Sequence, residues 1–275
     1  MALLLSAIFM PSNSLFGQSR FERNGDVIKL IFAETVKDVP GLVNVTNAVG
    51  NVHFEHNKTN LFCDSALFFR DLDLIHAYGR VHINQGDTIN MFCDSIKYDG
   101  NTKISKLQGN VRMRDKEYKL VTDSLEYDGE RSVGTYKNFA TISSISSDMK
   151  LTSIKGYYHA NIKTFFFKDS VRINHPEYRL ESDTLEFRTN SSTAHIHGPT
   201  IIYFDSTKVL CNKGTFFTDD DFVQLWNGAT IVDSSRTFYA DSMLYDQSTG
   251  VGQGYMNVDL YDSLENVQFK SNYLW

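Results

Sequence analysis

The 275-residue sequence contains no apolar run long enough to cross a bilayer as a helix. The longest run, Ala2–Met10, is interrupted only by Ser6 and is followed by the small residue Gly17. This pattern is typical of the apolar segment of a secretory signal peptide, although no basic residue precedes Arg20. We therefore expect residues 1–18 to be a signal peptide that lacks its first residues. The alternative is a frayed apolar N-terminus.

The sequence also lacks an excess of positive charge. It has 27 Lys and Arg against 33 Asp and Glu, which gives a formal net charge of −6 at pH 7. A nucleic-acid groove needs clustered basic residues, so we expect no nucleic acid partner. The chain is 41% hydrophobic and 22% charged, which excludes a disordered protein, and its 20 Phe and 14 Tyr favour strands.

Motifs of catalysis are absent as well. Neither a Gly-X-Ser-X-Gly elbow nor a phosphate-binding Gly-X-X-X-X-Gly-Lys loop occurs. His195 and His197 would face one side of a strand, but two histidines without a third ligand are not normally a metal site. We therefore expect a protein that is not an enzyme, with no catalytic residue, no cofactor and no metal site.

What the sequence does contain is an internal repeat of about 30 residues. Cys63-Asp64-Ser65 recurs as Cys93-Asp94-Ser95, and one position recurs every 29 or 30 residues along the chain. We name this series the Asp column: Glu34, Asp64, Asp94, Asp123, Ser153, Asp183, Asn212, Asp241 and Ser271. A second series, the Gly column, keeps the same phase: Gly50, Gly79, Gly109, Asn138, Asp169, Gly198, Gly228 and Met256.

Each repeat reads as two strands in which apolar and polar residues alternate. Apolar residues stand two positions before the Asp column and two and four positions after it, so we assign all three positions to one buried face. They also stand two and four positions after the Gly column. An apolar spacing of three just before the glycine indicates a bend or bulge there. Asp99-Gly100 and Asp128-Gly129 are typical of tight hairpin turns.

About seventeen short strands predict an all-β protein with almost no helix. Because the strands bend at their middles, the fold class we predict is an elongated, open β-jelly roll. In this fold an antiparallel sheet, built from repeats of about 30 residues with two strands each, is folded over into a V with an apolar inner face. No change in composition marks a boundary, so residues 24–275 are expected to form one domain that continues beyond the chain end in a longer protein.

The three cysteines, Cys63, Cys93 and Cys211, all directly precede the Asp column. Their spacing lacks a zinc signature. In a parallel solenoid Cys63 and Cys93 would stack about 4.8 Å apart, within reach of a disulfide. In a consecutive antiparallel sheet they would be two strands, about 9.6 Å, apart and could not bridge. We favour the antiparallel sheet and expect free, packed thiols.

Several segments in a fixed order carry a resemblance to a known family. They are 28–34 (Ile-Lys-Leu-Ile-Phe-Ala-Glu), Gly50-Asn-Val-His-Phe, Phe62-Cys-Asp-Ser, and the stretch from Tyr98-Asp-Gly to Leu107-Gln-Gly-Asn-Val-Arg. Together they resemble the OstA-like family, and most closely its members from the Bacteroidota. This family includes LptA, the periplasmic bridge protein of lipopolysaccharide transport, and the N-terminal domain of the outer-membrane translocon LptD.

The resemblance implies a function, a location and a site. It implies a periplasmic or outer-membrane-associated jelly roll that conveys lipopolysaccharide, joins other lipopolysaccharide-transport proteins by edge-strand addition, and stacks end to end. It also implies that inward side chains contact the acyl chains of lipid A. Those residues are Val52, Phe54, Phe62, Ala66, Phe68, Val81, Ile83, Phe92, Ile96, Tyr98, Val111, Met113, Val121, Leu125 and Tyr127.

Two groups of charged residues have alternative interpretations. By alternation the acidic residues of the Asp column share a face with the apolar residues, and burying them unpaired would be costly. We expect them at the bend or the groove rim, bonded to backbone N–H groups; the alternative is a series of divalent-cation ligands. A basic stretch is either a solvated outer face or a rim for anionic head groups: Lys103, Lys106, Arg112, Arg114, Lys116 and Lys119.

Three other functions compete with the lipid conduit. The first is a structural or adhesive β-repeat with a dry core and no lipid ligand. The second is a β-roll stabilised by metal ions on the Asp column. The third is a glycoside hydrolase, which needs two facing carboxylates at a fixed separation. An inner groove, in contrast to close packing throughout, distinguishes the conduit from the first of these.

Overall fold

The structure, a computed structural model, describes residues 27–86 and 88–274, so the expected signal peptide lies outside the described residues. These residues form 21 strands and one turn of 3-10 helix, η1 (Ala160–Ile162), which confirms the all-β prediction. The strands are β1 (Lys29–Phe32), β2 (Thr35–Asp38), β3 (Val45–His56), β4 (Thr59–Phe69), β5 (Leu74–Gln85), β6 (Ile89–Asp99), β7 (Ile104–Arg114), β8 (Tyr118–Asp128), β9 (Val133–Tyr136), β10 (Ala140–Ser144), β11 (Lys150–Ser153), β12 (Lys155–His159), β13 (Thr164–Asn174), β14 (Tyr178–Arg188), β15 (Thr193–Ile196), β16 (Thr200–Phe204), β17 (Thr207–Phe217), β18 (Phe222–Val232), β19 (Arg236–Asp246), β20 (Val251–Asp262) and β21 (Val267–Leu274).

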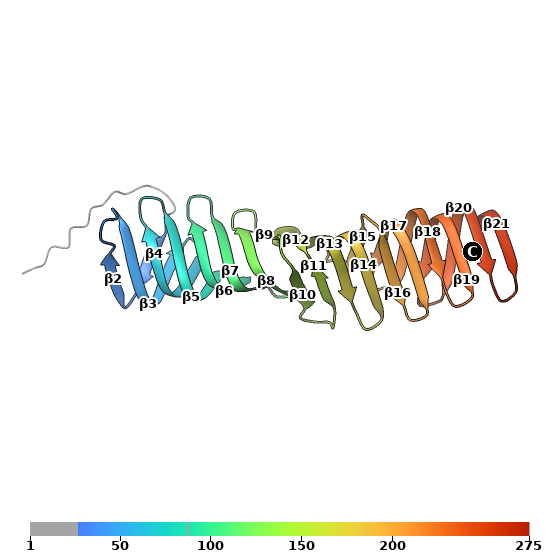
Figure 1. The fold of residues 1–275 in the computed structure, drawn as a ribbon, viewed down its shortest axis with the longest axis horizontal. Coiled ribbons are helices and arrows are strands. Elements are labelled where there is room, and N and C mark those ends of the chain that lie inside the picture. The colour runs from blue at the N-terminus through green and yellow to red at the C-terminus, as the bar shows by residue number, and fades with distance from the viewer. Residues whose placement is uncertain (1–26, 87, 275) are drawn as a thin grey trace, which may run out of the picture.

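All the strands belong to one sheet, in which the pairings are antiparallel. Four of the seventeen expected strands are interrupted at the bend, as β1/β2, β9/β10, β11/β12 and β15/β16, which accounts for 21 segments. The unbroken strand β8, for example, pairs with β9 through one half and with β10 through the other. The strands cross the long axis of the molecule, and the folded sheet gives an elongated body of two layers (Figure 1).

The bend lies at the Gly column, as the sequence predicts. The pairing register shifts between Val49 and Val52 on β3 and between Tyr78 and Val81 on β5, around Gly50 and Gly79. Gly79 has a φ of +74°, and the next residue, Arg80, is also left-handed at +43°. Two consecutive left-handed residues turn the strand sharply, and glycine adopts this conformation without steric cost.

The bend divides each repeat into two layers that pack against each other. We define the first layer as the segments that follow the Asp column and precede the Gly column, and the second layer as the remaining segments. Phe68 of the first layer meets Phe54 of the second with ring centroids 5.5 Å apart. The buried residues of both layers form one hydrophobic cluster along the molecule.

The acidic residues of the Asp column lie at the bend, as expected, but on the outer side and with side-chain partners. The expected backbone N–H partners are wrong for four of them, because a side chain 16 or 17 residues further along the sequence donates to each instead. We name these the bend pairs: Glu34–Asn51, Asp64–Arg80, Asp94–Asn110 and Asp241–Asn257. The acid also packs over the glycine: a Cβ atom on Gly79 would lie 2.5 Å from Asp64 Oδ2.

We predict that Gly79→Ala destabilises the fold markedly more than Gly41→Ala. Both glycines are left-handed, with φ of +74° and +80°, so each substitution should cost about 1 kcal/mol of backbone strain. Only Gly79 would also collide with Asp64, because nothing lies within 4 Å of a Cβ on Gly41. Urea unfolding followed by circular dichroism measures the difference; equal losses would show that Asp64 does not pack on Gly79.

The three cysteines are free and buried, as the antiparallel arrangement predicts. Cys63 on β4 and Cys93 on β6 are separated by the intervening strand β5. Burial is the main cause that raises the pKa of each of these thiols to about 12. They are therefore protonated and poorly nucleophilic at neutral pH.

Candidate functional site

Most of the side chains expected on the inner face are found there. Each of these residues is at most 8% exposed, and they come from both layers of β3 to β8. They are Val52, Phe54, Ala66, Phe68, Val81, Ile83, Ile96, Tyr98, Val111, Met113, Leu125 and Tyr127.

The inward placement of Phe62, Phe92 and Val121 is wrong. Phe62 is 38% and Val121 39% exposed, and Phe92 is half-buried and stacks on His82 on the outer face. The error comes from carrying the alternation straight through the Asp column. The pairing register also shifts on the strand that contains the Asp column, between Phe62 and Ser65 on β4. Residues before this shift therefore face the opposite side of the sheet from the side that unbroken alternation predicts.

The residues that replace them on the inner face stand one position earlier or one position later. The alternation alone did not identify them. The apolar spacing of three before the Gly column could have predicted the change of face, because a bulge on one strand also bends the strand paired with it. They are Leu61, Met91 and Leu120, together with Cys63, Cys93 and Thr122.

The two layers touch through aromatic rings along the inner face. Tyr118 on β8 meets Phe165 on β13 with centroids 5.4 Å apart. Further along, Tyr178 on β14 meets Phe216 on β17 at 4.8 Å in an edge-on arrangement. The inner face is therefore closely packed where these rings meet, and a guest molecule there has to separate the layers.

The layers end in two rows of hairpin turns that face each other, and we name the line between them the seam. The first row contains the turns after β3, β5, β7, β10, β13, β16, β18 and β20. The second row contains the turns after β2, β4, β6, β8, β12, β14, β17 and β19. The seam runs along the body, at the opposite ends of the layers from the bend.

Three cavities open along the seam. The first, about 510 Å³, is lined by Lys58 and Gln85 from one row and by Lys103 and Glu130 from the other. Its floor belongs to the inner face: Ile83, Met91, Tyr98 and Tyr127. The next two, about 390 and 550 Å³, share Glu117 and Lys163 in their linings. The seam is therefore the place where the packed interior approaches solvent.

Polar side chains bridge the seam and hold the two rows together. The Gln85 side chain donates to the Gly129 carbonyl at 3.1 Å, and the Tyr158 hydroxyl donates to Asp115 Oδ2 at 2.7 Å. Burial and the neighbouring Asp115 raise the pKa of Tyr158, so it stays a hydrogen-bond donor at neutral pH. Other bridges join His56 to Tyr98, Lys163 to Glu117, and Thr189 to Glu117.

The six basic residues of the basic stretch divide between the two alternatives, the rim at the seam and the solvated outer face. Lys103 and Lys116 line the seam cavities. The other four, Lys106, Arg112, Arg114 and Lys119, lie exposed along β7 and β8 on the outer face. Lys58 and Lys163 add further positive charge at the seam.

Neither a metal centre nor a membrane helix emerges from the described residues. Within residues 27–86 and 88–274, no three His, Cys, Asp or Glu side chains lie together as metal ligands. His195 bonds instead to the Thr215 hydroxyl, and His197 lies 3.6 Å from Glu186. In the same part of the chain, no helix is both long enough and apolar enough to span a membrane.

A family model described as OstA-like protein matches residues 27–183. The match covers the first seam cavity, the residues predicted to contact lipid, and the two central bridges from Gln85 and Tyr158. A search of the curated proteins returned no match.

Proposed function

The chain belongs to the OstA-like family, a family of binding and transport proteins and not of enzymes, and we propose that it binds lipopolysaccharide by its lipid A acyl chains and conveys it through the periplasm. The acyl chains would lie between the two layers, against the inner face. The two layers and the bend continue to β21, beyond the matched residues, so the arrangement between which acyl chains would lie extends along the described body.

The observation that carries this proposal is the 510 Å³ cavity at the seam. It joins solvent to the inner face, and three residues of its floor, Ile83, Tyr98 and Tyr127, are among those predicted to contact lipid. A volume of several hundred Å³ is typical of small-molecule sites. Each methylene moved from water to this floor gains about 0.8 kcal/mol, so a long acyl chain can offset the loss of seam bridges.

The charges at the mouth of the cavity suit an anionic head group. Lys58 and Lys103 outnumber the one acid that lines this cavity, Glu130. In the next cavity Lys116 adds positive charge, whereas Lys163 is paired with Glu117. The formal net charge of −6 belongs to the chain as a whole and does not describe this local mouth. Phosphate groups on the lipid would therefore lie at the seam while the acyl chains pass below it.

A second candidate function rests on the packing of the interior. The contacts of Phe54 with Phe68 and of Tyr178 with Phe216 bring the layers together, as in a dry structural β-repeat. This function predicts a protein that never opens at the seam. It differs from the conduit in one measurable property, the capacity to take up lipid.

Native mass spectrometry tests the proposal on the full chain purified from a Gram-negative host. We expect an added mass equal to that of lipid A or lipopolysaccharide, and lipid extraction should return the same species. A protein that has no added mass and stays so after incubation with lipopolysaccharide would leave the dry structural repeat as the function.

The edges of the sheet support the proposal of partners and self-association. Strand β21 pairs only with β20 among the described residues and exposes Phe269 and Tyr273. At the other edge β2 pairs with β3 and exposes Val36. Unpaired strand edges of this kind add strands from another chain. We therefore include end-to-end stacking and contact with other lipopolysaccharide-transport proteins in the proposed function.

Deleting residues 264–275, which removes β21, should weaken self-association. Sedimentation velocity over a range of concentrations measures it. The matched control is Phe269→Ser, which keeps the backbone edge and removes one exposed ring. A deletion that sediments like the full chain would contradict stacking through this edge.

A further inference from the structure

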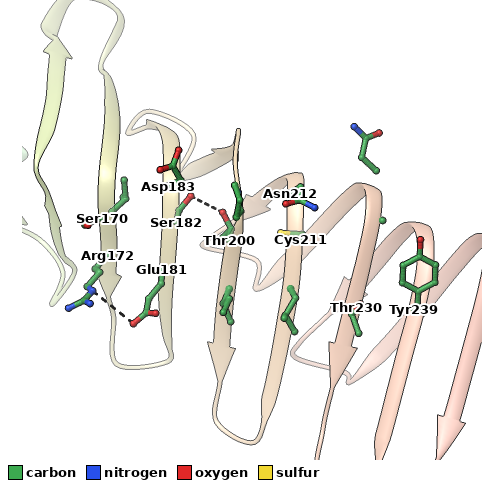
Figure 2. Close-up of a pocket in the computed structure, with 16 residues that line it drawn as sticks. Ser170, Arg172, Glu181, Ser182, Asp183, Thr200, Cys211, Asn212, Thr230 and Tyr239 are labelled. Carbon is green, nitrogen blue, oxygen red and sulfur yellow. Dashed lines mark hydrogen bonds and ion pairs between the residues drawn. The ribbon is translucent and has the colours of Figure 1, made fainter.

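A groove of about 840 Å³ lies on the outer face of the C-terminal half, away from the seam (Figure 2). Its floor is one cross-strand row of outward side chains, each paired in register with the next across β13, β14, β16, β17, β18 and β19. The row consists of Arg172, Glu181, Ile201, Leu210, Thr230 and Tyr239. Six adjacent strands extend about 24 Å, so the groove is a channel and not a compact pocket.

The same row is filled in the N-terminal half. There Phe62 stacks on His82 with centroids 5.8 Å apart, and His82 stacks on Phe92 at 4.4 Å. Arg112 then lies over the Phe92 ring. In the C-terminal half Leu210 takes the place of Phe62, and smaller side chains leave the outer face hollow. The difference lies in the side chains, since both halves have the same strand pairing.

The wall of the groove contains polar side chains that lack the bend pairs found elsewhere. For Asp183 the residue 16 positions later, where a bend pair has its donor, is Pro199, which has no side-chain donor. The Pro199 carbonyl instead accepts a hydrogen bond from the Asp183 N–H. For Asn212 the residue 16 positions later, where a bend pair has its donor, is Gly228, which has no side chain. The asparagine stands one position before this glycine, as Asn227-Gly228, whereas the third repeat has Gly109-Asn110. Within the described residues, the side chains of Asn212 and Asn227 form no hydrogen bond, and both line the groove.

The chemistry of the lining identifies the class of ligand. Arg172, the one Lys or Arg of the lining, is paired with Glu181 at 4.0 Å, and Asp183 adds a second anion, so the groove does not suit a phosphorylated or otherwise anionic ligand. The backbone groups of this face are committed to the sheet, so a peptide cannot add as a strand. What remains are amide, carboxylate and hydroxyl groups beside the Tyr239 ring, which suit a ligand rich in hydroxyl groups.

We propose that this groove binds a glycan chain, with Asn212, Asn227 and Asp183 bonding sugar hydroxyls and Tyr239 packing against a sugar ring. The glycan is distinct from a lipid held between the layers, because the sheet separates the groove from the inner face. Two sources share this chemistry: the glycan strands of the cell wall and the polysaccharide of lipopolysaccharide. The groove is separate from the proposed lipid site, so it can bind a glycan whether or not lipid lies between the layers.

Isothermal titration calorimetry of the full chain tests the inference, with soluble peptidoglycan fragments and lipid-free polysaccharide from lipopolysaccharide as the two probes. The decisive variant is Leu210→Phe with Thr230→His, which rebuilds the Phe62–His82 stack and fills the groove. We expect it, and Asn212→Ala with Tyr239→Ala, to weaken glycan binding at least tenfold. The matched control, Phe62→Leu with His82→Thr on the N-terminal half, should leave binding unchanged.

Each outcome decides the inference. Binding of one probe that is lost in the filled variant supports the groove and identifies the source of the glycan. No binding of either probe by the unmodified chain overturns it, as does binding that the filled variant retains. Lipid uptake by the filled variant, measured by native mass spectrometry, should equal that of the unmodified chain, so failure here is separate from failure of the lipid proposal.

Discussion

Phe54→Asp is expected to unfold most of the protein, whereas Phe62→Asp, eight residues away, should leave it folded. Phe54 is 1% exposed and contacts Phe68 across the two layers. Its replacement removes a buried ring, at about 3–5 kcal/mol, and places a carboxylate among apolar side chains. A loss of that size is comparable with the total stability of a typical domain.

The outer position should tolerate the same change. Phe62 is 38% exposed and packs mainly on the rings of His53 and His82. Losing these stacks should cost on the order of 1 kcal/mol. Urea unfolding with near-ultraviolet circular dichroism measures both variants. Comparable losses at the two positions would contradict the change of face at the bend.

A covalent bridge across the seam should abolish lipid uptake. Lys58→Cys and Glu130→Cys place thiols on opposite rows of the 510 Å³ cavity. A short, reducible bis-thiol reagent that joins them would keep the rows together, and acyl chains could no longer separate the layers. The native cysteines should not compete, because burial raises their pKa to about 12.

The matched control for the bridge is Lys58→Cys with Thr88→Cys. Both of these positions belong to the first row of turns and line one side of the second cavity. Joining them should leave lipid uptake unchanged, and reduction of the cross-seam bridge should restore it. Uptake that persists with the seam bridged would show that lipid does not pass through the seam.

The sequence contains enough information to predict the strand pattern and the bend. The two columns hold phase from Glu34 to Ser271, and a bulge at Gly50, Gly79 and Gly109 follows from the spacing of apolar residues around them. Two of the four strand interruptions also coincide with departures from the repeat. Ser153 and Lys155 flank one break, and Gly198-Pro199 forms another, where proline cannot donate to the ladder.

The side of the sheet on which Phe62, Phe92 and Val121 lie could not be read from alternation. Alternation fixes a face only while a strand is straight, and the bulge on one strand bends its neighbour. An aromatic residue such as Phe62 can also pack on either face, because His53 and His82 give it outer partners to stack on.

The seam and the outer groove depend on geometry that a linear pattern does not contain. Gln85 meets Gly129 and Asp115 meets Tyr158 only because the folded sheet brings the two rows of turns together. The groove depends on the difference between Leu210 and Phe62 at one repeat position, which a reading of apolar columns treats as equivalent.

Photo-cross-linking tests most directly whether lipid lies between the layers. A benzophenone amino acid placed at Tyr98, on the floor of the 510 Å³ cavity, is compared with the same probe at Phe62 on the outer face. After incubation with lipopolysaccharide and irradiation, a lipid adduct is expected at position 98 and none at position 62. Adducts at position 62 alone, or at neither position in a folded protein that is saturated with lipopolysaccharide, would contradict an inner lipid site.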